Sequence, residues 1–288
     1  MRALNVAGGL LVISLSLASV ASAQIAGMTT SISFSTNPSG ATSATVTLNV
    51  RHRFAERALK GKPYSAKQVS EHLQVLNDGT KISSEGRELH LFRDSQGRTR
   101  REESLRMMRP GAKLEADQTT AADPVLVEIA DPENGVAYIL EPGKRVAHMV
   151  VQERPKPAAD ACDAPPAPAA PVAAKTPPAA PQFSTPTFSQ EDLGTQTMEG
   201  LLVRGHRQTT VTPVGMVGND RPLTQVCDTW SSIEWRVTVL SKCSDPRTGD
   251  STTRLTNVDL SEPDPALFQV PSDYTVVEEK EQFTITLP

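Results

Sequence analysis

Aromatic side chains are scarce in this chain, which holds two Trp, three Tyr and seven Phe among its 288 residues. Surfaces that stack nucleic-acid bases depend on such side chains, so the chain is poorly equipped for that kind of recognition. A surplus of positive charge is also missing, because 29 Lys and Arg stand against 33 Asp and Glu. Nucleic-acid-binding proteins concentrate Lys and Arg on one face, and we therefore expect no nucleic-acid partner.

Local catalytic and metal-binding motifs are missing as well. None of the serines lies in GxSxG, and Gly143-Lys144 lacks the other residues of a phosphate loop. The five histidines do not occur as HxxxH, as HExxH or as pairs two residues apart; they are His52, His72, His90, His148 and His206. We expect no catalytic residue, no metal site and no cofactor, with each histidine on a strand surface or edge. An exported hydrolase with catalytic groups on separate strands remains an alternative.

Only the N-terminus is strongly apolar. Arg2 precedes a run of apolar and small residues from Ala3 to Val20, and Ala21-Ser22-Ala23 follows it. This layout predicts a secretory signal peptide over residues 1–23, cleaved after Ala23. The run is shorter than the roughly 20 apolar residues of a membrane-spanning helix. We expect a periplasmic or secreted protein without an integral membrane segment after cleavage.

Three cysteines follow the predicted cleavage point: Cys162, Cys227 and Cys243. Export permits disulfides. A turn at Ser231–Glu234 would place Cys227 opposite about residue 238, too far from Cys243 for a bond whose Cα atoms must lie within about 7 Å. This register predicts no disulfide, and a Cys227–Cys243 bond needs a different one. Cys162, in a proline-rich stretch, is expected to be a free thiol.

Residues 154–187 divide the chain. Pro and Ala dominate this stretch, and proline has no amide donor and a fixed φ. We expect a disordered linker. A structural or interaction protein that uses this insert to reach a partner is a second alternative.

On both sides of the linker, short β-branched runs alternate with turns rich in Pro, Asn, Asp and Gly, which is typical of successive antiparallel strands. The predicted strands are 30–35, 43–50, 88–93, 98–107, 124–129, 136–140, 146–150, 198–204, 208–212, 223–230, 234–242, 252–259 and 282–287. Between 198–204 and 208–212 the turn is expected at Gly205-His206. The pattern predicts that both halves of the chain join in one bent sheet with an apolar inner side.

Two segments are compatible with a helix. Arg51–Lys62 has helix-forming residues and no alternation, and its basic side chains would form a positive face, solvated or facing anionic lipid. Ser65–Leu76 carries a capping box but ends in Asn77-Asp78-Gly79, a strong hairpin signal, which favours a strand. A second basic cluster, Arg98, Arg100 and Arg101 beside Glu102 and Glu103, predicts cross-strand ion pairs on a solvated face.

Three stretches carry a resemblance to a known family: Asp94–Glu102, Asp131–Tyr138 with Glu141-Pro142, and Glu262–Tyr274. They resemble exported bacterial proteins of the LolA/LolB-like (outer-membrane lipoprotein carrier-like) superfamily, over about residues 64–151 and 194–278. The resemblance implies a strongly curved antiparallel sheet, an incomplete β-barrel, around an apolar groove. The proline-rich insert and the 30–50 hairpin depart from that pattern, and no ligand residue of the family maps onto this chain.

The expected organisation is a signal peptide (1–23), an N-terminal extension (24–63), a mostly β LolA-like domain (64–153 and 188–288) with one or two short helices, and the linker (154–187). The expected function is that of an envelope protein that binds an apolar ligand (a lipid, an acyl chain or a lipoprotein) or senses an envelope component. An envelope protein is a further expected partner. The sequence does not identify ligand-binding residues.

Overall fold

The computed structural model describes residues 30–36, 42–48, 58–86, 88–105, 124–152 and 185–287. The predicted signal peptide, His52, Cys162, residues 51–57 of the predicted helix and residues 154–184 of the predicted linker lie outside these ranges. No helix among the described residues is long and apolar enough to cross a membrane.

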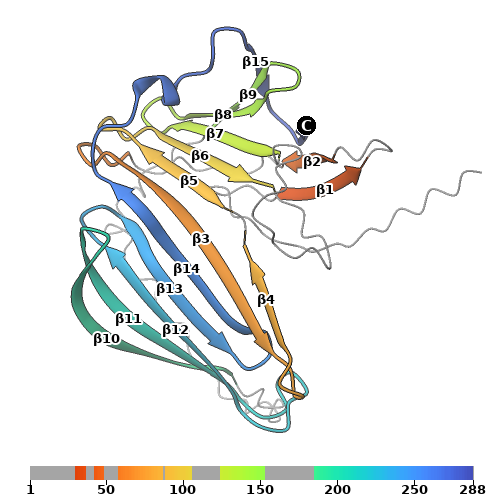
Figure 1. Ribbon diagram of the computed structural model, residues 1–288, viewed down its shortest axis with the longest axis vertical. Coiled ribbons are helices and arrows are strands. Elements are labelled where there is room, and N and C mark those ends of the chain that lie inside the picture. Colours follow the sequence, from red (N-terminus) through yellow and green to blue (C-terminus); the bar gives the residue numbers. More distant parts are fainter. Residues whose placement is uncertain are drawn as a thin grey trace, which may run out of the picture.

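The described chain is mostly β structure arranged in two sheets (Figure 1). The strands are β1 (Thr30–Thr36), β2 (Thr42–Leu48), β3 (Tyr64–Val75), β4 (Lys81–Glu85), β5 (Leu89–Arg93), β6 (Thr99–Ser104), β7 (Val125–Asp131), β8 (Val136–Glu141), β9 (Val146–Val151), β10 (Thr187–Met198), β11 (Leu201–Thr212), β12 (Leu223–Ser232), β13 (Val237–Asp245), β14 (Gly249–Asp259), β15 (Thr275–Glu279) and β16 (Phe283–Leu287). One 3-10 turn, η2 (Pro265–Phe268), precedes β15.

The large sheet has 13 strands in the order β10-β11-β12-β13-β14-β3-β5-β6-β7-β8-β9-β15, with β4 also paired to β3. The sheet is twisted and curved but does not close into a barrel, since β10 and β15 lie at its two ends (Figure 1). Strand β3 pairs with β5 from the first half of the chain and with β14 from the second half. This confirms the prediction that both halves form one bent sheet.

A small sheet of order β1-β2-β16 joins the predicted N-terminal hairpin to the last strand of the chain. It packs on one side of the large sheet, which we call the small-sheet side; the opposite side is the outer side. On the small-sheet side, Leu126, Ile139 and Val150 form one buried core with Val46 and Ile285. Strands β5–β9 and β15 together with the small sheet are called the two-layer region below.

Away from the small sheet, the same side of the large sheet is polar. The strand register places one row of side chains on it: Gln190, Gln208, Cys227, Cys243, Ser251 and His72. The next row is Asp192, His206, Thr229, Ser241, Thr253 and Ser70. Strands β10–β14, β4 and the second half of β3 are called the single-layer region. The expected apolar inner side therefore lies mainly in the two-layer region, where the small sheet covers it, although Leu255 of β14 is also buried on this side.

Two turns of the single-layer region differ from the prediction. The turn after β10 falls at Glu199-Gly200, where both residues have positive φ (49° and 76°), as a two-residue type I′ hairpin turn requires. The predicted turn at Gly205-His206 is wrong, because both residues lie inside β11. Gly205 is needed there for space, since a Cβ at this position would lie 2.7 Å from the Trp230 ring.

The hairpin of β12 and β13 turns two residues later than expected. Its turn spans residues 233–236, and Arg236 has a φ of 50°. A bulge between Trp230 and Ser231 then aligns Cys227 directly with Cys243. Their Cα atoms are 4.1 Å apart, and the two residues form a disulfide. The register that predicted no disulfide is wrong.

The expected helices are not present in the described residues. Ser65–Leu76 is strand β3 up to Val75, and it forms a hairpin with β4 through the Asn-Asp-Gly turn as predicted. Residues 58–62 of the other segment form a loop with a turn at Lys60-Gly61. Strand β15 was not predicted, and it pairs parallel to β9 in an otherwise antiparallel sheet.

Candidate functional site

An apolar hollow with a volume of about 460 Å³ lies on the outer side of the two-layer region. We call it the outer hollow. Its apolar lining residues are Ile129, Val136, Tyr138, Phe268, Val270 and Val276, and its polar ones are Asp131, Asn134 and Gln269. Small-molecule sites are typically apolar hollows of about 300–1,000 Å³ with a few polar groups, which this site matches in size and composition.

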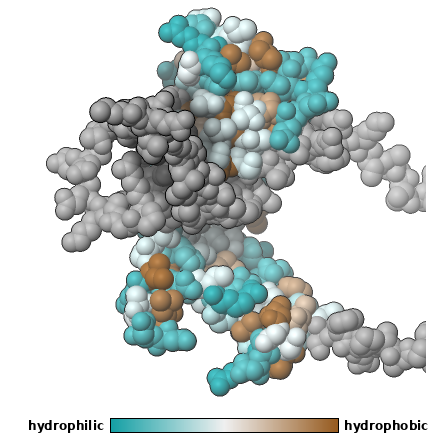
Figure 2. Space-filling view, turned by 90° about the vertical axis from the view of Figure 1, so that its right-hand side faces the viewer, coloured by the Kyte–Doolittle hydropathy of each residue, from teal (hydrophilic) through white to brown (hydrophobic). Residues whose placement is uncertain are grey.

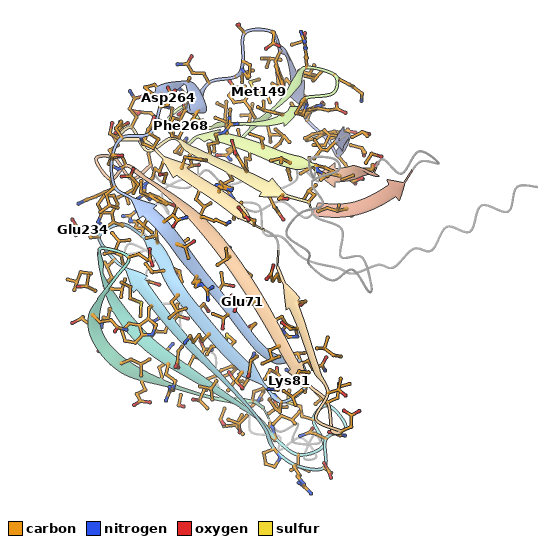
Figure 3. All side chains as sticks on the ribbon, in the orientation of Figure 1. Glu71, Lys81, Met149, Glu234, Asp264 and Phe268 are labelled. Carbon is orange, nitrogen blue, oxygen red and sulfur yellow. A yellow bond between two sulfur atoms is a disulfide. The ribbon has the colours of Figure 1, made fainter. Side chains whose placement is uncertain are left out.

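One wall of the outer hollow is the segment around η2. Pro265 can occupy the first position of this turn because its missing amide would have no partner there. The Asp264 carboxylate accepts a hydrogen bond from the Ala266 amide at 2.9 Å and so caps the turn. Figure 3 labels Asp264 and Phe268 in this segment. Phe268 is buried, and the Arg98 guanidinium lies 5.4 Å from its ring centre. Arg100 Nη1 donates to the Leu267 carbonyl at 3.1 Å, which fixes η2 on β6.

The rim of the hollow is polar but already internally bonded. The Asp131 carboxylate accepts hydrogen bonds from the Asn134 amide at 3.0 Å, the Asn134 side chain at 2.7 Å and the Glu133 amide at 3.1 Å. These bonds form the tight turn between β7 and β8. They hold the carboxylate in this turn and occupy part of its hydrogen-bonding capacity.

The opposite wall is β15, an edge strand of five residues. Val276 lines the hollow, although 49% of its surface remains exposed. Glu279, three residues further on, reaches the small-sheet side and contacts His148. One short strand therefore contributes to the hollow on one side of the sheet and to a charged contact on the other.

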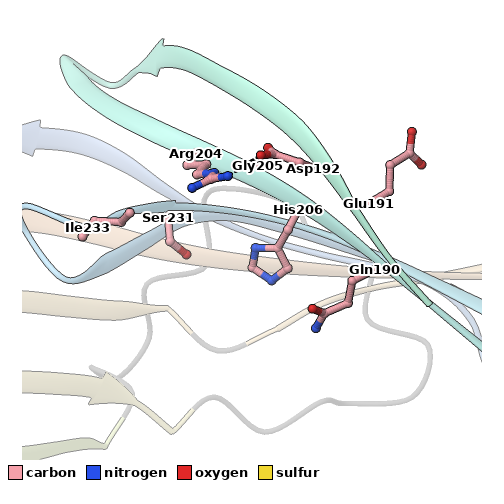
Figure 4. Close-up of a pocket in the computed structure, with 8 residues that line it drawn as sticks. All are labelled: Gln190, Glu191, Asp192, Arg204, Gly205, His206, Ser231 and Ile233. Carbon is pink, nitrogen blue, oxygen red and sulfur yellow. Dashed lines mark hydrogen bonds and ion pairs between the residues drawn. The ribbon is translucent and has the colours of Figure 1, made fainter. Parts of the chain in front are cut away.

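A second hollow, of about 430 Å³, lies in the single-layer region on β10–β12 (Figure 4). It brings together Asp192, Arg204, His206 and Ser231, residue types that also occur in hydrolases. The Asp192 carboxylate is paired with Arg204, which holds its pKa below the usual value, and the Ser231 hydroxyl is 3.0 Å from that of Thr238. Neither interaction involves the imidazole, so these contacts do not form a nucleophile–base–acid chain.

Exposed apolar side chains occur elsewhere as small groups. Val75, Leu76 and Ile82 belong to the β3–β4 hairpin, and Val214, Met216 and Val217 to the loop after β11. On the face shown in Figure 2, brown apolar patches are small and separated by teal polar surface. None of these groups lines the outer hollow.

Four of the five histidines lie in described strands. His72 and His90 are partly exposed on β3 and β5, and His206 is exposed on β11, as predicted. His148 differs, because it is only 8% exposed and lies between Glu141 and Glu279. The prediction of a surface position is wrong for this residue. Within the described ranges, no group of three or more His, Cys, Asp or Glu side chains could hold a metal ion.

The sequence contains part of the signal for the His148 site. In the β8–β9 hairpin, Glu141 pairs with Val146 and Ile139 with His148, so both polar side chains lie on one side and one diagonal step apart. Glu279 could not be found in this way, because it arrives on the unpredicted parallel strand β15.

The described residues of both basic clusters form ion pairs. Lys60 pairs with Glu133 at 2.7 Å, and Lys62 pairs with Glu234 and lies over Trp235. In the second cluster, Arg98 pairs with Asp94. Arg100 pairs with Glu102 on its own strand at 2.6 Å, with both side chains largely buried. The partners of Arg98 and Arg100 therefore lie four and two residues away along the chain, and not on a neighbouring strand as predicted.

Comparison with known proteins yields no family model and no curated protein that matches. Among solved structures, an uncharacterized conserved protein from Thermus thermophilus shares 9% identity over 76% of this chain and 91% of its own, with a TM-score of 0.34. A putative outer membrane lipoprotein-sorting protein domain from Vibrio parahaemolyticus shares 8% identity over 71% of this chain and 88% of its own, with a TM-score of 0.23. At such TM-scores the likeness is weak, and the functional proposal below depends on the chain's own geometry.

Proposed function

We propose that this chain is an exported envelope protein that binds an apolar ligand, the size of an acyl-chain segment, in the outer hollow. The observation that carries the proposal is the hollow itself, with six apolar lining residues and a rim whose carboxylate is already bonded. A lipid or the acyl group of a lipoprotein has the matching chemistry. The proposed role is binding and not catalysis.

Two features support export. Residues 1–23 have the pattern of a signal peptide. The Cys227–Cys243 disulfide is the kind of bond that persists in oxidising compartments such as the periplasm. Both are consistent with an envelope ligand, which a cytosolic protein would not meet.

We place the apolar ligand in the outer hollow because the other apolar surface of the large sheet is already covered. On the small-sheet side, the apolar residues of β7–β9 are packed against β2 and β16. In the single-layer region that side carries Gln, Ser, Thr and His side chains, which offer little apolar area. Among the described residues, the outer hollow combines apolar lining with open access.

The test is a titration of the mature chain with a fluorescent fatty acid. Wild-type protein should bind it saturably, and Val276→Asp should weaken binding by about tenfold or more, because an unpaired carboxylate in an apolar site is costly. Val276 is half exposed, so this change should leave folding intact. The matched control is Leu202→Asp, an exposed apolar position on β11 that should bind as wild type does. Absence of saturable binding to the wild-type chain would refute the proposal.

A further inference from the structure

Two loops leave the large sheet together at one end of the single-layer region. The strand register joins one residue from each of β11, β12, β13, β14 and β3 into a row: Thr209, Val226, Ser244, Asp250 and Leu73. Just beyond this row, the loop after β11 (213–222) and the turn between β3 and β4 (76–80) both project at the lower end of the sheet (Figure 1). We call residues 75–82 and 213–222 the apolar tip.

The apolar tip holds six of the fourteen large apolar side chains that are exposed among the described residues. These six are between 40% and 56% exposed: Val75, Leu76, Ile82, Val214, Met216 and Val217. The other eight are spread over the rest of the described chain. Single apolar side chains on a surface are ordinary, whereas their concentration at one end of a molecule indicates an interaction site.

The loop after β11 bonds its own polar groups internally. The Asn219 side chain accepts from the Val217 amide at 3.1 Å. The same side chain donates to the carbonyls of Pro213 at 2.8 Å and Arg221 at 2.6 Å. The Gly215 amide donates to the Asn219 carbonyl at 2.8 Å. The loop is therefore a closed unit whose apolar side chains remain exposed.

The turn between β3 and β4 has the same construction. The Leu76 amide donates to the Thr80 carbonyl at 2.8 Å, and the Gly79 amide donates to the Leu76 carbonyl at 2.9 Å. The Thr80 amide donates to the Asp78 carboxylate at 2.9 Å. A segment that enters the apolar part of a membrane must bond its backbone groups internally, because lipid tails offer no partners. These bonds provide such partners in both loops.

The charges of the apolar tip balance. It carries two basic and two acidic side chains, all exposed: Lys81, Arg221, Asp78 and Asp220. Lys81, at the lower end of the molecule in Figure 3, directly precedes Ile82. Long basic side chains can keep the charged end among lipid headgroups while their carbon chains lie along apolar surface. Balanced charge fits a zwitterionic lipid surface, to which apolar insertion is the main attraction.

We propose that the apolar tip docks this protein on a lipid surface, with the apolar side chains of both loops inserted at the boundary between headgroups and acyl chains. The two loops are separated by β13 and β14, so that β12 and β3 lie three strand spacings, roughly 14 Å, apart. A bilayer accepts two separate projections without a matching shape, which a protein pocket would need. The tip is distinct from the outer hollow, because β3 leads away from it to Tyr64, which pairs with Arg93 in the two-layer region.

Flotation of the mature chain with phosphatidylcholine vesicles tests the docking directly. The wild-type chain should float with the vesicles. Met216→Asp/Val217→Asp should lower its partition coefficient by about tenfold or more, because two charges replace apolar side chains at the membrane boundary. Both side chains are about half exposed, so the variant should keep the urea midpoint of the wild type. A wild-type chain that stays in solution, or a double variant that floats as the wild type does, would overturn the proposal.

Ile82→Asp tests the other loop and provides a second variant in case the double variant does not fold. The Ile82 side chain is 47% exposed on the short strand β4. This change should lower the partition coefficient by about threefold or more. Undiminished flotation would contradict docking through both loops.

The matched control is Ile233→Asp, which changes a 75% exposed apolar side chain in the turn at the opposite end of β12 and β13. It should float as the wild type does, and so should Val276→Asp in the outer hollow. Loss of flotation in either variant would place the membrane contact away from the apolar tip and contradict the proposal. An increase in salt from about 0.05 M to about 0.5 M should change the wild-type partition coefficient less than about twofold, since the charges of the tip balance. Release of the protein at high salt would contradict docking by apolar insertion.

Discussion

The two regions of this molecule use one continuous sheet in opposite ways. In the two-layer region, Ile139 and Val150 on the small-sheet side are fully buried beneath the small sheet. In the single-layer region, the same side carries Thr229 and Thr253 and has no comparable cover in the described residues. Apolar burial beneath a second sheet thus stabilises one end of the large sheet. At the other end a smaller apolar cluster around Leu201, Val203 and Val239 acts together with long ladders, ion pairs and a disulfide.

Removal of core volume beneath the small sheet should have the largest effect. Ile139→Ala should lower the free energy of unfolding by about 4 kcal/mol, because the residue is fully buried in the core and a cavity adds to the lost burial. Thr229→Ala in the single-layer region should cost less than about 0.5 kcal/mol. Urea unfolding of both variants checks this contrast. Similar losses at the two positions would contradict it.

Loss of the disulfide should have the next largest effect, on the single-layer region. The double variant Cys227→Ser/Cys243→Ser removes a cross-link between residues 16 apart, which is worth about 3 kcal/mol in the chain-entropy account. Hydrogen exchange should show the loss in β12 and β13 before it appears in β7–β9. Uniform loss of protection along the whole chain would show that the two regions unfold as one unit.

Arg93 connects the two regions, and its removal should have an intermediate effect. It is 7% exposed, its Nε donates to the Lys62 carbonyl at 2.8 Å, and its Nη2 donates to the Trp235 carbonyl at 2.9 Å. Burial holds the pKa of its guanidinium below the usual value, yet the group remains charged at neutral pH.

Arg93→Met should cost about 2 kcal/mol, because two charge-assisted hydrogen bonds are lost while the buried volume is largely kept. The measurement is the urea midpoint, followed with Trp fluorescence for the single-layer region and circular dichroism for the whole chain. The two transitions should separate in the variant. Coincident transitions with unchanged stability would show that Arg93 does not couple the regions.

The smallest effect is expected from surface ion pairs of the single-layer region. The Arg207 guanidinium donates to Asp228 at 2.7 and 2.8 Å and holds the pKa of that carboxyl below its usual value. The contribution of this ion pair to the free energy of unfolding is therefore fully present above the unfolded-state pKa of Asp228. It is lost as the pH falls through the lower folded-state pKa of the same carboxyl.

Asp228→Asn should cost no more than about 0.5 kcal/mol at neutral pH, since Arg207 is 41% exposed and solvent screens the pair. Urea unfolding at about pH 7 and about pH 3 checks the direction of this pH dependence. The difference in the free energy of unfolding between the variant and the wild type should shrink at the lower pH. A difference that grows on acidification would contradict the assignment.

The fold was largely predictable where local patterns decide it. The alternation of short β-branched runs with turn residues correctly predicted β5 and β7–β9. The Asn77-Asp78-Gly79 turn correctly predicted the β3–β4 hairpin. The failures come from non-local geometry. The bulge at Trp230 shifts the register of β12 and β13 and so brings the two cysteines together. Gly205 was predicted to be part of a turn, but it is a glycine because the Trp230 ring leaves no room for a side chain there.

The candidate site was less predictable than the fold. Its floor comes from β7 and β8, whereas its walls come from η2 and β15, more than 120 residues later in the sequence. Parallel pairing of β15 with β9 has no local sequence signal. The apolar groove was expected on the inner side of the bent sheet, but β2 and β16 cover the apolar residues there, and nothing in the alternation pattern showed this cover.

The most direct test of the account maps where an acyl chain binds. The mature protein would be cross-linked to a fatty acid that carries a photoreactive group at its end, and the modified residues identified by mass spectrometry. Adducts should concentrate on residues 129–138 and 268–276, which surround the outer hollow. Adducts concentrated on β10–β14, or on β2 and β16, would contradict the account.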